Sequence, residues 1–350
     1  MTNIQKNSKI RTSPQPFCRI CQSPGRVLYQ KMTDRLFDVP GKWNIRQCQN
    51  SECGLLWLDP IPIKEDIGKV YLNYYTHGDI NSVPKSFLRR AINFINKGYL
   101  ANQYKYLRKQ INIWQRILGF LVYLDPGLKS ELDFEVMYLP AKSNGQLLDI
   151  GCGDGRFLIK MRDLGWQVEG TEVDETAVET ARKNKLKVSS SQLSEKTYPE
   201  NFFDVITLRS VMEHLPDPLD ILIECRRILK DTGYLMIITP NTESRAHSIY
   251  KEKWFDLDPP RHLHIFSPEN LENLLIKAGF KTIKIWTTSR NLRSSLIGSW
   301  DIQKKGCHKM GSRQPLFIKI KAKFLQFFEE IILKIRPDSG DEIVLKVQKI

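Results

Sequence analysis

The segment QLLDIGCGDGRFL, residues 146–158, contains the clearest structural pattern in the chain. Its apolar first half is typical of a buried strand, and its second half places a glycine at every second position before a predicted helix. Glycine lets the backbone approach a ligand closely, and the free N–H groups at a helix N-terminus favour polar and anionic groups. The segment therefore predicts a strand, a ligand-binding loop and a helix in succession.

An acidic residue, Glu172, follows Gly151 by 21 residues, at the predicted end of the next strand. Dinucleotide sites have the pattern G-x-G-x-x-G, in which the third glycine lets the helix pack on the strand. Arg156 occupies that third place here, which disfavours a nicotinamide-dependent oxidoreductase. The pattern G-x-G-x-G with its distant acid instead resembles motif I of the class I S-adenosylmethionine-dependent methyltransferases.

This resemblance implies roles for the segment and for positions after the later strands. Asp149 would hold the glycine loop and the ammonium side of S-adenosylmethionine, and Glu172 would accept hydrogen bonds from both ribose hydroxyls. At the adenine end the family has an acid that accepts a hydrogen bond from the adenine amine. This chain has Gln192 there, and its amide oxygen would accept the same hydrogen bond. The implied cofactor-binding residues are Asp149, Gly151, Gly153, Gly155, Glu172, Gln192, Leu193, Leu208 and Arg209.

Strands and helices alternate from residue 141 to residue 290, which indicates a parallel α/β sheet. A final strand is predicted at 342–347, after the Ser339-Gly340 turn. The order resembles the seven-stranded, Rossmann-like methyltransferase sheet, in which a reversed last strand lies between the fifth and the sixth. By that resemblance residues 141–350 are the methyltransferase domain, and 290–337 are a helical insertion with an amphipathic helix at 316–335.

Two later segments contain the candidate catalytic residues. Residues 211–218, VMEHLPDP, follow a strand that begins FDVI, and this block also resembles the methyltransferase family. Residues 254–266, WFDLDPPRHLHIF, follow the fifth strand and concentrate histidine, arginine and aromatic side chains. Methyl transfer to a hydroxyl needs alignment and a base. The candidates for this role are His262 first, then His264 and His214; helix capping and packing are the alternative roles.

Four cysteines form two close pairs near the start of the chain, Cys18 with Cys21 and Cys48 with Cys53. Paired thiolates suit tetrahedral zinc, and the second pair is wider than the usual C-x2-C. Residues 17–75 also resemble the N-terminal zinc-ribbon region of a bacterial methyltransferase subfamily. We therefore predict a structural Zn2+ site in a zinc-ribbon-like subdomain at 17–75; four unrelated reduced thiols are the alternative.

Composition limits the class of protein. The 350 residues fit two domains, and the polar start of the chain lacks a signal-peptide core. The apolar run at 117–124 is far shorter than the roughly 20 residues that span a bilayer. The seven cysteines are an odd number, which argues against a disulfide scaffold. These features predict a cytoplasmic protein, at most peripheral to the inner face of the membrane, with a disordered tail at 1–16.

The net charge of +14 lies mainly outside the predicted catalytic core. Between residues 85 and 129, nine Lys and Arg residues stand against one acid, and aromatic residues are interleaved with them. Residues 76–140 are therefore predicted to form a basic helical linker or cap, with helical spacing from Leu107 to Leu118. Three roles stay open: a cap over the acceptor pocket, contact with an anionic membrane surface, and nucleic-acid binding, which is the least favoured.

The function implied by the resemblance is methyl transfer from S-adenosylmethionine to a small molecule or a saccharide. O-methylation is the default and C-methylation the alternative, and a cell-envelope glycan or lipid-linked precursor is a candidate acceptor. An RNA or protein methyltransferase is a second hypothesis, supported only by the charge. A non-catalytic cofactor-binding scaffold is a third, and the intact glycine loop and acid argue against it. The sequence determines neither the acceptor atom nor the oligomeric state.

Overall fold

The computed structural model describes residues 10–71, 87–190, 193 and 198–350. Among them, seven strands form a mixed sheet in the order β12-β13-β10-β9-β6-β7-β8. β13 is antiparallel to β12, whereas β6 and β8 are parallel to β7. The predicted α/β sheet, with its reversed last strand between the fifth and the sixth, is confirmed. The strands are β6 (Gln146–Ile150), β7 (Gln167–Thr171), β8 (Lys187–Ser189), β9 (Phe203–Arg209), β10 (Leu229–Pro240), β12 (Phe280–Thr288) and β13 (Glu342–Lys349).

Two helices of the sheet region begin with side-chain caps. The Asp174 side chain accepts from the backbone N–H groups of Thr176 and Ala177, at the start of α5 (Glu175–Lys183). The Ser267 side chain accepts from the backbone N–H of Asn270 in a capping box, with Pro268 as the first residue of α8 (Pro268–Lys277). These short-range bonds satisfy N–H groups that have no partner within the helix, and they depend only on residues close in sequence.

Contacts within the chain define two compact units. The first contains residues 1–75, 208–226 and 237–350, and the second contains residues 76–207 and 227–236. The division after residue 75 coincides with a predicted boundary, and the predicted domain organisation stays a prediction. The cysteine-containing region shares a unit with the end of the chain, and the basic helices share a unit with the glycine loop.

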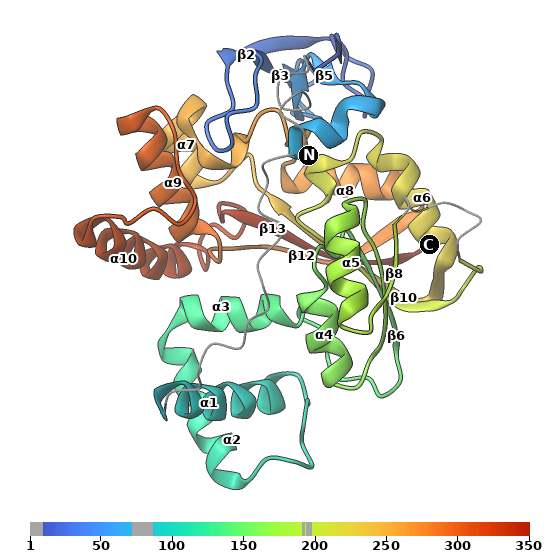
Figure 1. The fold of residues 1–350 in the computed structure, drawn as a ribbon, viewed down its shortest axis with the longest axis vertical. Coiled ribbons are helices and arrows are strands. Elements are labelled where there is room, and N and C mark those ends of the chain that lie inside the picture. Colours follow the sequence, from blue (N-terminus) through green and yellow to red (C-terminus); the bar gives the residue numbers. More distant parts are fainter. Residues whose placement is uncertain (1–9, 72–86, 191–192, 194–197) are drawn as a thin grey trace. The chain divides into compact units, whose positions relative to one another are not determined.

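In the second unit, the basic helical segment contacts residues that precede strands β6 and β7. Helices α1, α2 and α3 of this segment are labelled in Figure 1. The Trp166 indole nitrogen donates to the Tyr106 hydroxyl at 3.0 Å, and the Ala141 N–H donates to the Tyr104 carbonyl oxygen at 2.8 Å. Residues 76–140 are therefore not a free linker where the structure describes them. The helices of this unit are α1 (Phe87–Gln103), α2 (Ile113–Gly119), η3 (Phe120–Leu124), α3 (Pro126–Glu135), α4 (Arg156–Asp163) and α5.

The predicted helical run from Leu107 to Leu118 is wrong in its first half. Leu107 has a left-handed φ of 54°, and the helix begins only at Ile113. Asn112 caps it by accepting from the Gln115 N–H at 2.9 Å, while the Gln115 side chain accepts from the Asn112 N–H at 3.0 Å. This reciprocal cap starts a new helix at a position that the apolar spacing alone does not reveal.

The first unit contains a small antiparallel sheet in the order β11-β4-β3-β2. Its strand β11 comes from the segment that contains two of the candidate histidines, since His264 pairs with Trp57 and Ile265 with Leu56. The apolar side chains beneath this sheet include Trp43, Ile45 and Trp254, all nearly inaccessible to solvent. Residues 17–75 are therefore joined to the 254–266 segment by a shared sheet and core. The bounds are β2 (Gly25–Met32), β3 (Trp43–Cys48), β4 (Leu56–Asp59) and β11 (His264–Ile265).

The prediction of a disordered tail at 1–16 is wrong for residues 10–16; residues 1–9 lie outside the described part. Strand β1 (Thr12–Ser13) pairs antiparallel with β5 (Ile61–Pro62). Arg11 bonds to the buried Asp66 carboxylate through both its backbone N–H and its guanidinium, at 2.8 and 2.9 Å. The pairing partner is distant in sequence, so the polar composition of the segment does not reveal it.

The predicted insertion before the last strand contains two helices, α9 (Leu292–Lys305) and α10 (Leu316–Ile332), which pack against each other (Figure 1). α10 ends three residues before the predicted position. No helix among the described residues is both long and apolar enough to cross a membrane. The remaining helical segments are η2 (Lys64–Tyr71), η4 (Met212–His214), α6 (Pro218–Ile228), α7 (Arg245–Tyr250), η5 (Lys251–Lys253), η6 (Phe255–Leu257) and α8.

Candidate functional site

The glycine loop between β6 and α4 has the backbone conformation that its sequence requires. Gly151, Gly153 and Gly155 have φ values of 68°, 55° and 82°, a left-handed region that favours glycine. A Cβ atom on Gly155 would lie 2.3 Å from the Leu186 side chain, whereas one on Gly153 would meet open space. Gly155 thus serves the packing of the loop, and Gly153 leaves free space beside the backbone.

Glu172, just after β7, holds this loop from the neighbouring strand. Its carboxylate accepts the Gly153 N–H at 2.9 Å, the Val173 N–H at 2.7 Å and the Asp174 N–H at 3.0 Å. A carboxylate has about four lone-pair sites, so acceptor capacity remains for a ligand hydroxyl. The predicted acid and the glycine loop are therefore in direct contact within the second unit.

The other predicted cofactor residues have distinct environments. Asp149 is buried at the end of β6 and accepts from the Thr207 hydroxyl at 2.6 Å. Leu193 and Leu208 are buried, and Arg209 is partly exposed at the end of β9. Gln192 lies outside the described residues.

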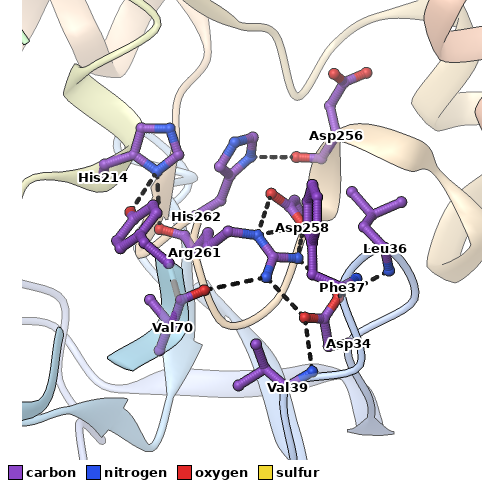
Figure 2. A network of polar contacts seen from close by, with 11 residues as sticks. Asp34, Leu36, Phe37, Val39, Val70, His214, Asp256, Asp258, Arg261 and His262 are labelled. Carbon is purple, nitrogen blue, oxygen red and sulfur yellow. Dashed lines mark hydrogen bonds and ion pairs between the residues drawn. The ribbon is translucent and has the colours of Figure 1, made fainter. Parts of the chain in front are cut away.

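The three candidate histidines share one hydrogen-bonding pattern, part of which Figure 2 shows. In each, Nδ1 faces a backbone carbonyl oxygen: that of Arg261 for His214, at 3.0 Å, and that of Asp256 for His262, at 2.6 Å. His264 faces the Leu215 carbonyl oxygen at 3.1 Å. A carbonyl oxygen can only accept, so we assign the proton of each neutral ring to Nδ1. This tautomer leaves Nε2 as an acceptor.

His214 and His262 are neighbours, although 47 residues separate them in the chain. Their ring centroids are 4.8 Å apart, and the Tyr71 hydroxyl lies 3.1 Å from His214 Nδ1. Burial lowers the pKa of His214 to about 3 and that of His262 to about 4. Both rings are therefore neutral near pH 7. His264 lies apart from this pair in strand β11, where burial lowers its pKa to about 4.

Glu213 adds a buried carboxyl group to this part of the first unit. Its backbone carbonyl oxygen accepts from the Leu263 N–H at 2.7 Å, and its side chain accepts from the Thr239 hydroxyl at 2.9 Å. Burial raises the pKa of Glu213 to about 8, so the group is mostly protonated near neutral pH. The Glu213, His214 and His262 side chains thus form a polar cluster that is uncharged in this state.

Arg261, which directly precedes His262, anchors the 254–266 segment (Figure 2). Its guanidinium is completely buried and forms a two-pronged ion pair with Asp34 at 2.7 and 2.8 Å. It also binds Asp258, with Nε at 2.9 Å from one carboxylate oxygen, and it lies 4.6 Å from the centre of the Phe37 ring. Burial raises the pKa of the Asp34 carboxyl, but the Arg261 charge outweighs it and lowers that pKa. Asp34 thereby ties the cysteine-containing region to the histidine segment.

Comparison with protein-family models identifies the family that part of the chain matches. Residues 126–285 match the model described as a methyltransferase domain. The match assigns a methyltransferase domain to this part of the chain. This match includes the glycine loop, Glu172 and the His214 region.

Two relatives of this methyltransferase domain are ubiquinone biosynthesis O-methyltransferases. That of Actinobacillus pleuropneumoniae serotype 5b is 33% identical over 127 residues, 32% of this chain and 54% of the relative. That of Thiobacillus denitrificans is 27% identical over 150 residues, 39% of this chain and 65% of the relative. The chain thus spans between half and two thirds of the length of these relatives. A solved SAM-dependent methyltransferase from Archaeoglobus fulgidus is 24% identical, with a TM-score of 0.44, covering 63% of this chain and 93% of that one.

Outside the methyltransferase domain, the four predicted zinc ligands gather in one cluster. Their sulfur atoms lie within 4.8 Å of one another, with 3.7 Å between Cys18 and Cys53 and 3.3 Å between Cys21 and Cys48. A tetrahedral zinc site with Zn–S bonds of about 2.3 Å has sulfur atoms roughly 3.8 Å apart. The Ile20 N–H points to the Cys18 sulfur at 3.4 Å. The donor set therefore fits a structural Zn2+ ion.

Sequence reasoning missed the residues that position the histidines. Asp34 is one of two acids between the cysteine pairs, and its partner Arg261 is 227 positions away. Tyr71 contacts His214 from outside any motif, and Asp256 contacts His262 from a position in the 254–266 segment that was given no role. The one usable signal was Arg261 itself, the single Arg or Lys in a segment that also contains Asp256 and Asp258.

Proposed function

We propose that this protein is an S-adenosylmethionine-dependent methyltransferase that methylates an oxygen atom of a small molecule. The observation that carries the proposal is the contact of the Glu172 carboxylate with Gly153 in a G-x-G-x-G loop, within residues that match a methyltransferase domain. The names of the relatives support oxygen as the acceptor atom.

S-adenosylmethionine, when bound, supplies an electrophilic methyl group on a sulfonium. In this proposal Glu172 accepts from one ribose hydroxyl through its remaining lone pair, and the open space beside Gly153 admits the ligand to the backbone. Asp149, Gly151, Gly155, Leu193, Leu208 and Arg209 complete the proposed cofactor residues, and Gln192 remains the proposed adenine contact.

We assign removal of the acceptor proton to the His214–His262 pair. Each ring has a neutral, unprotonated Nε2 because its Nδ1 proton is held by a backbone carbonyl oxygen. The O–H bond of the acceptor would break and its proton would pass to Nε2. The oxygen would form its bond to the methyl carbon as the carbon–sulfur bond of the cofactor breaks, with the electron pair left on sulfur. Proton transfer of this kind contributes typically about 10²–10⁴-fold in rate. His264 has the same tautomer but is engaged in the small sheet, so we rank it below the pair.

We also propose that the acceptor is a saccharide or a lipid-linked precursor. A saccharide or a lipid-linked precursor suits a protein with basic helices that contact an anionic membrane surface. Three observations support that contact: Trp114, Phe120 and Leu124 are 66%, 61% and 76% exposed, they lie near Arg116 in sequence, and no acid occurs between residues 85 and 124. We also propose, as a separate point, that the four cysteines hold a structural Zn2+ ion.

The decisive experiment supplies purified protein with methyl-labelled S-adenosylmethionine and separate lipid, glycan, RNA and protein fractions. The proposal expects label in a small-molecule, glycan or lipid fraction, with the methyl group on oxygen by mass spectrometry. Label confined to RNA or protein would overturn the acceptor class. Binding of NADH without binding of S-adenosylmethionine would overturn the cofactor assignment.

A further inference from the structure

Helix α10 presents a continuous apolar face that the rest of the described chain leaves exposed. Six large side chains on it are between 42% and 62% exposed. At about 3.6 residues per turn, these six lie within an arc of roughly 100°. Contiguous exposed apolar surface of this kind is rare on soluble proteins unless it serves an interaction. The six residues are Phe317, Ile320, Phe324, Phe327, Phe328 and Ile331.

The opposite face of α10 packs against neighbouring segments of the first unit. Ile318 and Ala322 are buried, and α10 packs against α9. Both acids of the helix serve contacts with other segments: Glu329 is 3% exposed and bonds to Arg245 at 3.2 Å, and Glu330 accepts from the Ser289 hydroxyl at 2.5 Å. The exposed arc is therefore separate from the face through which the helix packs in the fold.

The charge around the exposed arc is strongly positive. Residues 303–336 contain nine Lys and Arg residues and only the two acids just described. Helical spacing places Lys321 beside one edge of the arc and Lys319 and Lys323 beyond the other. This distribution disfavours a second copy of the same helix as the occupant, because like charges would meet. An apolar face bordered by lysines complements a surface with acidic headgroups above an apolar layer.

We propose that α10 is an interfacial membrane helix that lies in the headgroup region of an anionic bilayer. The aromatic and aliphatic arc enters the boundary of the acyl chains, and the flanking lysines contact lipid phosphates. The helix does not span the bilayer, in agreement with the absence of a membrane-crossing helix among the described residues. The inference concerns α10 alone and is independent of the proposed methyl transfer.

Vesicle co-sedimentation of the full chain tests this proposal. Wild-type protein is expected to bind vesicles that contain phosphatidylglycerol and to bind pure phosphatidylcholine at least tenfold more weakly. The double variant Phe324→Glu/Phe327→Glu should lose at least tenfold in binding to the anionic vesicles. The matched control is Ile249→Glu/Ile276→Glu, which places the same charge at two other exposed sites, 61% and 52% accessible, and should bind like wild type.

Two further measurements separate this role from misfolding and from self-association. Circular dichroism and S-adenosylmethionine binding should be the same for wild type and both double variants. Tryptophan in a Phe324→Trp variant should be quenched by brominated lipid more strongly than in wild type. The proposal is overturned if wild type does not bind anionic vesicles at low salt, or if the control loses as much binding as the α10 variant. It is also overturned if sedimentation shows a dimer that only the α10 variant dissociates, without vesicle binding.

Discussion

His214 Nδ1 lies 3.0 Å from the backbone carbonyl oxygen of Arg261, and this contact sets the proton position of the histidine. Arg261 is in turn held through its buried guanidinium by Asp34 and Asp258. One ion-pair network therefore positions the backbone that selects the His214 tautomer. In the proposed reaction, Asp34 and Asp258 thus act as positioning residues, through Arg261, for the His214 Nε2.

Replacing either histidine of the pair should impair methyl transfer more than cofactor binding. His214→Gln and His262→Gln each remove a proton acceptor, and the larger of the two effects should be a fall in kcat of about 10²–10⁴-fold. His264→Gln is the matched control because His264 has the same Nδ1–carbonyl contact but lies in β11. Steady-state kinetics with the acceptor and calorimetry with S-adenosylmethionine provide the readouts. Equal loss in all three variants would contradict the assignment.

Glu172→Ala should weaken S-adenosylmethionine binding by roughly tenfold or more, the loss of about one charged hydrogen bond. Glu172→Gln should lose less, since it retains one oxygen that can accept from the ribose or from Gly153. Isothermal titration calorimetry measures both. Unchanged affinity in the alanine variant, with the fold intact, would remove Glu172 from the site.

Two glycine substitutions should separate packing from ligand access. Gly155→Ala should destabilise the protein, because its Cβ would lie 2.3 Å from Leu186 at a φ of 82°. Gly153→Ala meets no neighbour, so its cost is mainly that of its left-handed φ, about 1–2 kcal/mol. Thermal unfolding should therefore show the larger loss for Gly155→Ala. Calorimetry on the folded Gly153→Ala protein should show weaker S-adenosylmethionine binding, and wild-type affinity would argue against close approach of the ligand.

Purified protein should contain about one zinc per chain. Cys48→Ser should reduce the zinc content and the unfolding temperature, because a structural metal stabilises the fold that binds it. Cys225→Ser is the control, since Cys225 is an equally buried thiol on α6 outside the cluster. Elemental analysis and thermal unfolding test both variants. Folded wild-type protein without metal would rule out the zinc site.

Arg261→Met should lower the free energy of unfolding by about 3–5 kcal/mol, because it leaves two buried carboxylates without their partner. Arg19→Met is the control: it removes the more exposed pair with Asp217, and pairs of that kind contribute about 0–1 kcal/mol. Chemical denaturation measures both losses. A comparable loss in the two variants would show that the Arg261 network adds little to stability.

The buried histidines should make stability depend on pH below about 6.5. The unfolded chain takes up protons there, while folded His214, His262 and His264 stay neutral down to about pH 3–4. Each histidine therefore lowers the free energy of unfolding as pH falls, by at most about 1.4 kcal/mol per pH unit. His264→Gln should reduce that slope in denaturation curves measured from pH 6.5 to pH 4.

Glu213 should act in the opposite direction. Its pKa rises to about 8 on folding, so the unfolded chain loses this proton first as pH increases. The free energy of unfolding should then decrease as pH rises from about 4.5 to about 8 because of this group. Glu213→Gln should flatten the decrease between pH 6.5 and pH 8. An unchanged slope would mean that Glu213 is already ionised at neutral pH.

What the sequence determined by itself was the local structure and the order of elements. The glycine loop, the Asp174 and Ser267 caps and the alternation of strands with helices depend on residues a few positions apart. Together with the family resemblance, those features predicted the seven-stranded sheet and the methyltransferase domain. The resemblance assigned Glu172 to the ribose, and the structure added its contact with Gly153, since adjacent parallel strands place the loop and the acid at the same edge.

Tertiary structure alone decided which distant side chains meet. Only folding brings Asp34 to Arg261, His214 to His262, and β1 to β5. It also showed that the apolar arc of α10 remains exposed rather than entering the core. Amphipathic spacing reveals that a helix has an apolar face, but not whether another segment covers it. Long-range contacts depend on the complete packing of the chain, and therefore no local pattern specifies them.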